Sequence, residues 1–332
     1  MNTAHCLEFI LRSFAVSALA CLMIAAFRRA SRQVRMAVTL SAWAVMALVA
    51  VDFIVPLPRL PLWTAVREEV GGALVSSANR AVLPVWWAGT LALLAREVLG
   101  VIRLRKMIRE SEPNIESTWL REIKSGCAAL GLDSPVELRW SDRLGPCAAG
   151  WFKPVILLPH AAAEWPAEMR AQVIIHELAH FHRRDLWVEI ATRLVAALHW
   201  FNPLSAVLRR WSAVERETAC DALVVQHRGD AVAYAESLLS LASTPSPQAC
   251  APVLTLMSQQ RSQLQRRIRE LFASDASRTR KWWMFDAAFA TAAILLLVAC
   301  SISGPALKTT VSKRMQEEVE LRLSADPFPG ER

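Results

Sequence analysis

Four long apolar stretches constrain the fold of this chain more than any other feature of its sequence. They cover residues 7–27, 36–55, 81–102 and 282–303. Each is long enough to cross roughly 30 Å of hydrocarbon as a helix. The chain is 54% hydrophobic, and the excess is concentrated in these stretches. The sequence therefore predicts an α-helical membrane protein with four transmembrane helices.

The first stretch lies where a signal peptide would lie, but it lacks the features of one. No basic segment precedes it, and Arg28, Arg29, Arg32 and Arg35 follow it at once. Such a cluster is typical of a stop signal after a membrane span. We therefore expect the first stretch to be a membrane helix, and the Trp282-Trp283 pair marks the interfacial start of the fourth.

Clusters of arginine and lysine predict the orientation. They lie in the 28–35 loop, at the end of the third stretch and just before the fourth. All three fall on one side of the membrane, which is the cytoplasm by the positive-inside rule. This topology predicts three spans in 1–106, a cytoplasmic domain at 107–281, the fourth span, and an extracytoplasmic tail at 304–332. The net charge of +8 follows from it, so no direct nucleic-acid partner is expected.

Some features of the apolar segments have two interpretations. Arg12, Asp52, Arg96 and Glu97 lie near the ends of spans, where they snorkel or pair structurally. The alternative is that they form part of a path for a signal. The apolar segment 186–201 is either a core helix or lies partly in the membrane surface, and the sequence does not decide between these.

The seven cysteines show no paired spacing. Because four of them fall in the expected cytosolic domain, we expect free buried thiols rather than disulfides or a cysteine-based metal site.

A short motif in the expected cytoplasmic domain carries the chemistry. Residues 176–180 read His-Glu-Leu-Ala-His within a segment that lacks proline and glycine. Positions i and i+4 of a helix share a face, so His176 and His180 can bind one metal ion. Glu177 then lies beside the metal, where the general base of a zinc peptidase belongs. Chance produces the pattern in on the order of one such chain in a hundred, so other residues must support it.

A catalytic zinc ion needs a third protein ligand. Asn202-Pro203 predicts the start of a helix that runs to about Gln226. Glu217 and Asp221 share one face of it. We predict Glu217 as the third ligand and Asp221 as the group that hydrogen-bonds a ligand imidazole and sets its tautomer. The alternative is that both are solvated charges paired with nearby arginines. Glu215 competes with Glu217 but has no acidic residue four positions later.

The residue that stabilises the transition state is less well indicated. His199 is our candidate, and a structural hydrogen bond at a helix junction is its alternative role.

A small sheet is expected before the motif. Residues 136–140 alternate like a strand, and 147–159 read as a turn and a second strand. The edge of such a sheet either pairs with an extended substrate or is covered.

The chain resembles the BlaR/MecR antirepressor type of membrane zinc metallopeptidase. The resemblance covers most of residues 1–303. The segments that carry it are Gly150 with Pro154-Val155-Ile156-Leu157-Leu158-Pro159, the 176–180 motif, Arg184-Asp185, His199-Trp200-Phe201-Asn202-Pro203, Glu217-Thr218-Ala219-Cys220-Asp221 and Tyr234-Ala235 with Leu238-Leu239.

The resemblance implies a mainly helical α+β peptidase domain of the gluzincin type in the bacterial inner membrane. It implies one Zn²⁺ per chain, held by His176, His180 and Glu217, with Glu177 activating water. It also implies a signal transducer whose protein substrate is a winged-helix repressor, with self-cleavage common. Membrane lipid is a further expected partner, and homodimerisation stays open.

The chain departs from the antibiotic-sensing members at its C-terminus. Only 29 residues follow the fourth stretch, and they contain no Ser-x-x-Lys motif. We therefore expect no penicillin-binding sensor domain and no acylation by beta-lactams. Two alternatives to a regulatory protease stay open, namely a housekeeping membrane peptidase and a non-catalytic membrane signalling scaffold.

Overall fold

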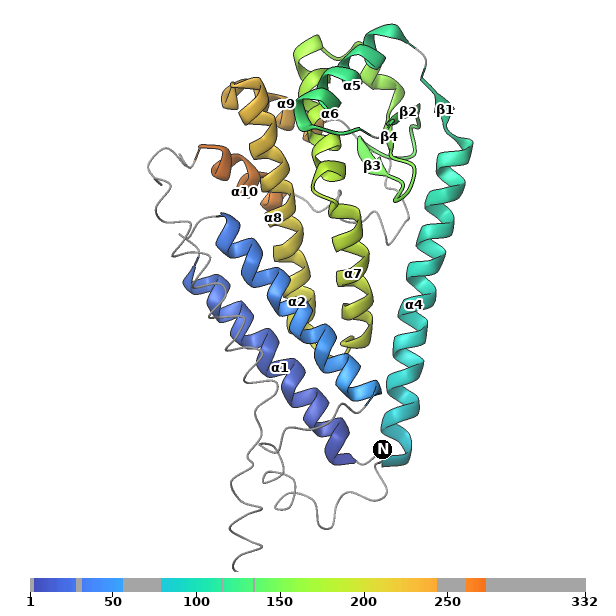
Figure 1. Ribbon diagram of the computed structural model, residues 1–332, viewed down its shortest axis with the longest axis vertical. Coiled ribbons are helices and arrows are strands. Elements are labelled where there is room, and N and C mark those ends of the chain that lie inside the picture. Colours follow the sequence, from blue (N-terminus) through green and yellow to red (C-terminus); the bar gives the residue numbers. More distant parts are fainter. Residues whose placement is uncertain are drawn as a thin grey trace, which may run out of the picture.

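The computed structural model describes residues 3–27, 32–55, 79–114, 116–133, 135–243 and 261–272. Within them the protein is mostly helical, with a bundle of long helices and a head that contains a small sheet at one end (Figure 1). The predicted fourth span at 282–303, the predicted tail at 304–332 and residues 56–78 between the second and third spans lie outside the described residues.

Three described helices are long and apolar enough to cross a membrane. They are α1 (Thr3–Ala26), α2 (Arg32–Ile54) and α4 (Asn79–Glu110). Their candidate spans are Phe9–Ala26, Val34–Ile54 and Val82–Glu110, which agrees with the first three predicted stretches. Large apolar side chains such as Leu91, Val98 and Ile102 lie exposed on α4, as expected of a helix that faces lipid.

Two further helices lie among these three. They are α7 (Asp185–Leu198) and α8 (Pro203–Arg228), which form an antiparallel hairpin (Figure 1). α7 contacts α2 and α4, and α8 contacts α1 and α2. Leu208 belongs to the same buried cluster as the side chains of α1 and α2. The segment 186–201, which the sequence left undecided, therefore packs against the candidate membrane helices with one face, while Trp187, Leu194 and Trp200 stay exposed.

Local signals form the tip of this hairpin. The side chain of Asn202 accepts a hydrogen bond from the Leu204 N–H (3.0 Å), and Pro203 occupies the first turn of α8, as predicted. Trp86 of α4 donates through Nε1 to the Leu198 carbonyl (3.0 Å). The indole of Trp200 lies so close to Gly89 that a Cβ there would be 2.5 Å from its ring. The tip of the hairpin is thus held against α4 by a hydrogen bond and by close packing.

The polar residues that the sequence placed near the ends of the spans form ion pairs in the structure. Arg12 of α1 donates to Asp52 of α2 at 2.9 Å. Glu97 of α4 pairs with Arg96 at 3.0 Å and with Arg193 of α7 at 3.1 Å. Structural pairing, which the sequence suggested for these residues, is therefore confirmed.

The head contains a four-stranded sheet in the order β1-β2-β4-β3. The strands are β1 (Glu112–Pro113), β2 (Glu137–Trp140), β3 (Cys147–Ala149) and β4 (Val155–Leu158). β2 and β4 are parallel, and β3 runs antiparallel to β4, with Ala148 opposite Ile156. The strands expected within 136–140 and 147–159 are therefore present, and β3 lies at an edge of the sheet.

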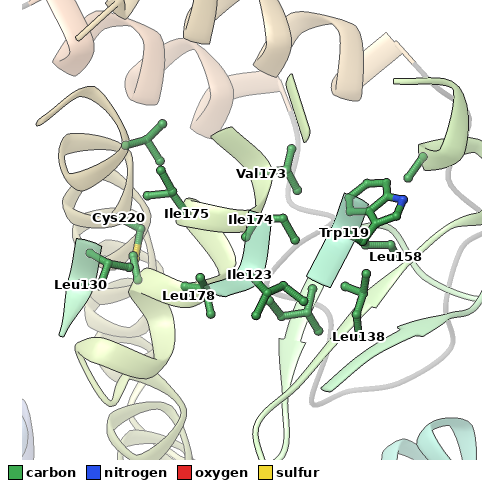
Figure 2. Close-up of a cluster of buried hydrophobic side chains, with 14 of the residues drawn as sticks. Trp119, Ile123, Leu130, Leu138, Leu158, Val173, Ile174, Ile175, Leu178 and Cys220 are labelled. Atoms are coloured by element: carbon green, nitrogen blue, oxygen red, sulfur yellow. The ribbon is translucent and has the colours of Figure 1, made fainter. Parts of the chain in front are cut away.

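Four helices and a short 3-10 turn complete the described structure. They are α5 (Ser117–Leu130), the turn His160–Glu164, α6 (Ala167–His182), α9 (Ala231–Ser243) and α10 (Arg261–Phe272). Figure 2 shows Trp119 and Ile123 of α5, Leu158 of β4 and Ile174 and Leu178 of α6 in one buried cluster. Cys220 of α8 belongs to the same cluster. Because it is covered on several sides, α6 is buried almost all round.

All five cysteines among the described residues are free, and Cys6, Cys147 and Cys220 are also buried as predicted, whereas Cys21 and Cys127 are half-buried.

Candidate metal centre

The buried helix α6 presents His176 and His180 on one face, as the motif predicts. Their rings lie 5.1 Å apart between centroids, at nearly a right angle. Glu217 of α8 approaches both, with Oε2 at 3.4 Å from His176 Nε2 and Oε1 at 3.7 Å from His180 Nε2. Ligand atoms of the three residues lie within 4.8 Å of one another. The fold therefore brings the three predicted metal ligands together.

Two buried atoms in this cluster have no hydrogen-bond partner among the described residues. They are His180 Nε2 and Glu177 Oε2. Unpaired buried polar atoms are costly, and a metal ion with its water would satisfy both. Two imidazoles and one carboxylate are also a usual ligand set for catalytic zinc. The residues present fit such a metal.

Each predicted ligand histidine has a carboxylate close to its Nδ1 atom. His176 Nδ1 lies 3.2 Å from Asp221 Oδ1 and 3.0 Å from the Tyr234 hydroxyl, which donates to Asp221 at 2.7 Å. His180 Nδ1 lies 3.0 Å from Asp185 Oδ2. A carboxylate at Nδ1 favours the tautomer that leaves Nε2 free for a metal. Asp221 is thus placed as the sequence predicted.

The sequence patterns did not predict Asp185 as the hydrogen-bond partner of His180, although Arg184-Asp185 is one of the segments that resemble the family. Its position depends on the break between α6 and α7. Arg184 adopts a left-handed conformation (φ 57°), which is uncommon for a residue other than glycine. The helix breaks at this residue, and Asp185 begins α7 next to His180. The signal available in the sequence was an aspartate three positions after the end of the motif helix.

Arg267, on a helix far along the chain, bonds Asp221 and lies close to Glu217. Arg267 of α10 donates to Asp221 through Nη2 (2.6 Å) and Nε (2.8 Å), and its Nη1 lies 3.3 Å from Glu217 Oε2. No sequence pattern distinguished Arg267 from the other arginines of its helix. Only the tertiary structure identifies it as a neighbour of the centre.

Burial and neighbouring charges act on these groups in opposite directions. Burial by itself raises the pKa of the Glu217 carboxyl, but the hydrogen bond with His176 and the charge of Arg267 outweigh burial and lower that pKa to about 2. Burial favours neutral His176, yet Asp221 and Glu217 raise the pKa of its imidazole to about 10. Because its pKa is lowered, the Glu217 carboxyl is ionised at neutral pH.

Glu177 behaves differently. Burial raises the pKa of its carboxyl, and the nearby histidines offset only part of that effect. A raised pKa brings a carboxyl closer to the pH at which it exchanges protons efficiently. Among the three polar residues of the motif and Glu217, Glu177 is the one suited to accept and return a proton.

The expectation that His199 stabilises the transition state is wrong. His199 ends α7, and its ring nitrogens lie 2.8 Å from Ser13 Oγ and 2.9 Å from the Met46 carbonyl. The 14-residue helix α7 carries the chain about 20 Å away from the end of α6. His199 therefore has the structural hydrogen-bonding role that was its alternative.

The competing residue Glu215 also lies apart from the metal ligands. Its side chain is buried between Arg35 of α2 (3.0 Å) and Arg266 of α10 (2.6 Å). These contacts bind it to two other helices.

Several relatives share about half of this chain. The regulatory protein BlaR1 of Bacillus licheniformis is 27% identical over 161 residues, which are 48% of this chain and 26% of the relative. The methicillin resistance mecR1 protein of Staphylococcus aureus is 25% identical over 170 residues, 49% of this chain and 28% of the relative. The mecR1 protein of Staphylococcus epidermidis matches equally. The chain thus spans about a quarter of the length of these relatives.

The family described as BlaR1 peptidase M56 matches residues 63–271. This range contains α6, α8 and all but the last residue of α10, which carry the predicted metal ligands, the predicted general base and Arg267. Since the match covers more than half of the chain, this protein belongs to the BlaR1 peptidase M56 family.

Proposed function

We propose that this protein is a membrane-embedded zinc metalloendopeptidase. The observation that carries the proposal is the buried cluster of His176, His180 and Glu217 with Glu177 beside it. An ion-pair cluster built only for stability has no reason to leave the buried His180 Nε2 and Glu177 Oε2 without a hydrogen bond. A site that binds a metal ion and a reacting water needs both of these atoms free of other hydrogen bonds.

The side chains of the centre divide the catalytic work. Zinc bound there would supply the Lewis acidity that activates water and polarises the scissile carbonyl. Glu177 takes the proton of the attacking water and passes it to the leaving amine. Asp221 and Asp185 hold the two imidazoles in the required tautomer, and Tyr234 braces Asp221.

The edge strand β3 supports an extended peptide as the substrate. β3 pairs with β4 on one side, and no described strand pairs with its other side. The Ala148 backbone hydrogen-bonds Glu177, so this edge lies beside the general base. A peptide added to a sheet edge is held extended by main-chain hydrogen bonds. Such binding would present its scissile bond to Glu177.

The basic ends of the membrane helices support a cytoplasm-facing site. Arg35 near the start of α2 contacts Glu215 in α8, and α4 ends with Arg103, Arg105 and Lys106 close to β1. Both basic ends therefore lie at the same end of the bundle as the metal centre (Figure 1). By the positive-inside rule this end is cytoplasmic. We keep the domain limits 107–281, 282–303 and 304–332 within this proposal.

A regulatory role is the most specific part of the proposal. One relative is named a regulatory protein and another a methicillin resistance protein. By resemblance, we infer that the substrate is a winged-helix repressor in the cytoplasm of a bacterium and that self-cleavage accompanies activation.

Zinc content tests the metal centre first. The detergent-purified wild type is expected to hold about one zinc per chain, and Glu217→Ala is expected to lose it. Glu236→Ala is the matched control, because Glu236 is an exposed acid on α9. A folded wild type that binds no zinc would contradict the peptidase and favour the membrane scaffold.

Cleavage products test the regulatory role. The zinc-loaded protein in nanodiscs is incubated with a winged-helix repressor, chosen where one is encoded beside its gene, and, separately, with an unfolded protein. Cleavage of the repressor at one position supports regulation. Degradation of the unfolded protein at many positions, with the repressor intact, supports the housekeeping alternative.

A further inference from the structure

A cavity of about 120 Å³ adjoins the metal centre and extends along the membrane helix α4. His180 and Glu217 lie in its wall, together with Ala148 of the edge strand β3. The cavity therefore begins at two of the metal ligands and beside the residue that contacts Glu177. None of the predicted roles of the centre uses this space.

Three helices each turn one face towards the cavity. α4 contributes Glu97, Val101 and Leu104, which are spaced by four and three residues and so share a face. α7 contributes Leu186, Glu189, Ile190 and Arg193 at the same kind of spacing, and α8 contributes Ala213, Arg216 and Glu217. The opposite face of α4 carries the exposed Val98, Leu99 and Ile102. A candidate membrane helix thus forms one wall of a space next to the metal centre.

The charged side chains in the wall already neutralise one another. Arg193 bonds both Glu97 (3.1 Å) and Glu189, and Arg216 bonds the other oxygen of Glu189. Asp185 is bonded to His180 and Arg183. Because the acids are paired, the cavity does not call for a cation. The body of the cavity is lined by Val101, Leu104, Leu186, Ile190 and Ala213, which suits an apolar group.

Two N–H donors in the same wall lack an acceptor. Arg216 Nη1 and Trp151 Nε1 are buried and make no hydrogen bond to any described residue. Arg216 is only 7% exposed. Buried donors of this kind are costly unless a ligand supplies an acceptor. A peptide carbonyl is such an acceptor, and a peptide held at the metal would bring one.

The size of the cavity limits the side chain. An apolar cavity of roughly 150 Å³ admits benzene. This one is somewhat smaller, at about 120 Å³. It matches a branched aliphatic side chain such as leucine better than an aromatic ring.

From the wall, the volume and the two unpaired donors, we propose that this cavity is the specificity subsite of the peptidase. It takes a medium-sized aliphatic side chain beside the scissile bond, with α4 as one wall, while Arg216 and Trp151 donate to a main-chain carbonyl of the substrate. The inference rests on the proposed function, because the subsite has meaning only next to a metal that cleaves peptides.

Hydroxamates test the subsite by binding rather than by turnover. The probes are acetohydroxamate, which reports the metal alone, and N-acetyl amino-acid hydroxamates of glycine, leucine, phenylalanine and glutamate. Their affinities are measured by calorimetry on the zinc-loaded full chain in detergent. The leucyl probe is expected to bind on the order of tenfold or more tighter than the glycyl probe. Equal affinities for these two, or a preference for glutamate, would overturn the proposal.

Variants of α4 test whether this helix forms the wall. Leu104→Ala enlarges the cavity and is expected to shift the preference from leucine towards phenylalanine. Val101→Phe fills it and is expected to remove the advantage of leucine while glycyl binding persists. Leu99→Ala is the matched control on the same helix, because Leu99 is 51% exposed. A Leu99→Ala profile identical to that of Leu104→Ala would overturn the assignment of the wall.

Trp151→Phe tests the unpaired donor without disturbing the buried ion pairs. It is expected to weaken the leucyl probe by about two- to tenfold and to leave acetohydroxamate unchanged. An unchanged leucyl affinity removes Trp151 from the subsite.

The failure of the inference differs from the failure of the proposed function. If acetohydroxamate does not bind and the chain holds no zinc, the peptidase proposal itself fails. If acetohydroxamate binds and the side chain of the amino-acid hydroxamate does not change the affinity, the metal centre is supported and the subsite is contradicted.

Discussion

At the scale of single residues, the centre separates groups that hold a metal from a group that moves a proton. Glu177 is fully buried and Glu217 is half-buried, and their pKa values shift in opposite directions. Arg267 and the histidines stabilise ionised Glu217, whereas burial dominates at Glu177. Two carboxyl groups with pKa values pushed apart are a mark of divided roles in a catalytic site.

Glu177→Gln keeps the size of the side chain but removes its basicity. We expect the variant to bind zinc like the wild type and to lose about 10²- to 10⁴-fold in peptide cleavage, which is the usual contribution of a general base. Zinc content and turnover are measured on the same preparation. Turnover equal to that of the wild type would remove Glu177 from its role.

Asp185→Asn and Asp221→Asn each weaken the support of one ligand histidine. Loss of such a partner typically costs about 10- to 100-fold in metal affinity. We expect both variants to lose zinc affinity in competition with a chelator. Asp142→Asn is the control, because Asp142 is an exposed acid that bonds His160, away from the centre. If Asp185→Asn binds zinc as tightly as this control, Asp185 has no part in the site.

The raised pKa of His176 predicts a pH dependence of metal binding. In the metal-free protein the stabilisation from the charged imidazole is full below the ordinary histidine pKa of 6.5, and it is lost as the pH rises through the folded pKa of about 10. Zinc must displace this proton at neutral pH, so its apparent affinity is expected to rise about tenfold per pH unit between roughly pH 7 and 9. Chelator competition across this range measures the slope, and a flat profile would contradict the protonated state.

At the scale of elements, the α7–α8 hairpin connects the metal centre to the membrane helices. α7 begins with Asp185, which bonds His180, and its far end is fastened to α4 through Trp86 and Trp200. α8 begins at that far end and returns to bring Glu217 to the centre. The position of the third ligand therefore depends on packing at the other end of the bundle.

Gly89→Ala tests this packing. The added Cβ would lie 2.5 Å from the indole of Trp200, so the ring or α4 must move. We expect the variant to lower the free energy of unfolding by about 1–3 kcal/mol, as overpacking does. Thermal unfolding in detergent gives the comparison. Trp200→Leu in the Gly89→Ala background makes room for the methyl group and is expected to recover part of the loss. No recovery would place the strain elsewhere.

At the scale of the whole molecule, buried ion pairs join three helices around the metal ligands. Arg35 of α2 bonds Glu215 of α8 and Glu270 of α10, each at 3.0 Å. Arg266 and Arg267, also of α10, bond Glu215 and Asp221. A candidate membrane helix is thus linked to the centre through charges two residues from the third ligand.

Arg35→Met breaks this link at one end. Removing one partner of a buried pair leaves an incompletely compensated charge, which costs about 3–5 kcal/mol. The double variant Arg35→Met with Glu215→Leu removes both charges and is expected to recover only part of that stability, because Glu270 and Arg266 each still lose a partner. Calorimetry of the two variants and the wild type closes the cycle. Independent, additive losses would show that the pair is not coupled.

The sequence by itself determined the features that depend on short-range order. Apolar length predicts three of the described helices, and the i, i+4 spacing of His176 with His180 and of Glu217 with Asp221 predicts the metal ligands and one supporting acid. These patterns suffice because a helix puts such residues on one face whatever surrounds it.

Only the tertiary structure decided which distant residues meet this face. Asp185 reaches His180 through the left-handed turn at Arg184, and Arg267 reaches Asp221 from a helix more than forty positions along the chain. His199 was misplaced because α7 leads away from the centre into the bundle. Spacing along the chain says nothing about such contacts, since they depend on how helices pack and where the chain reverses.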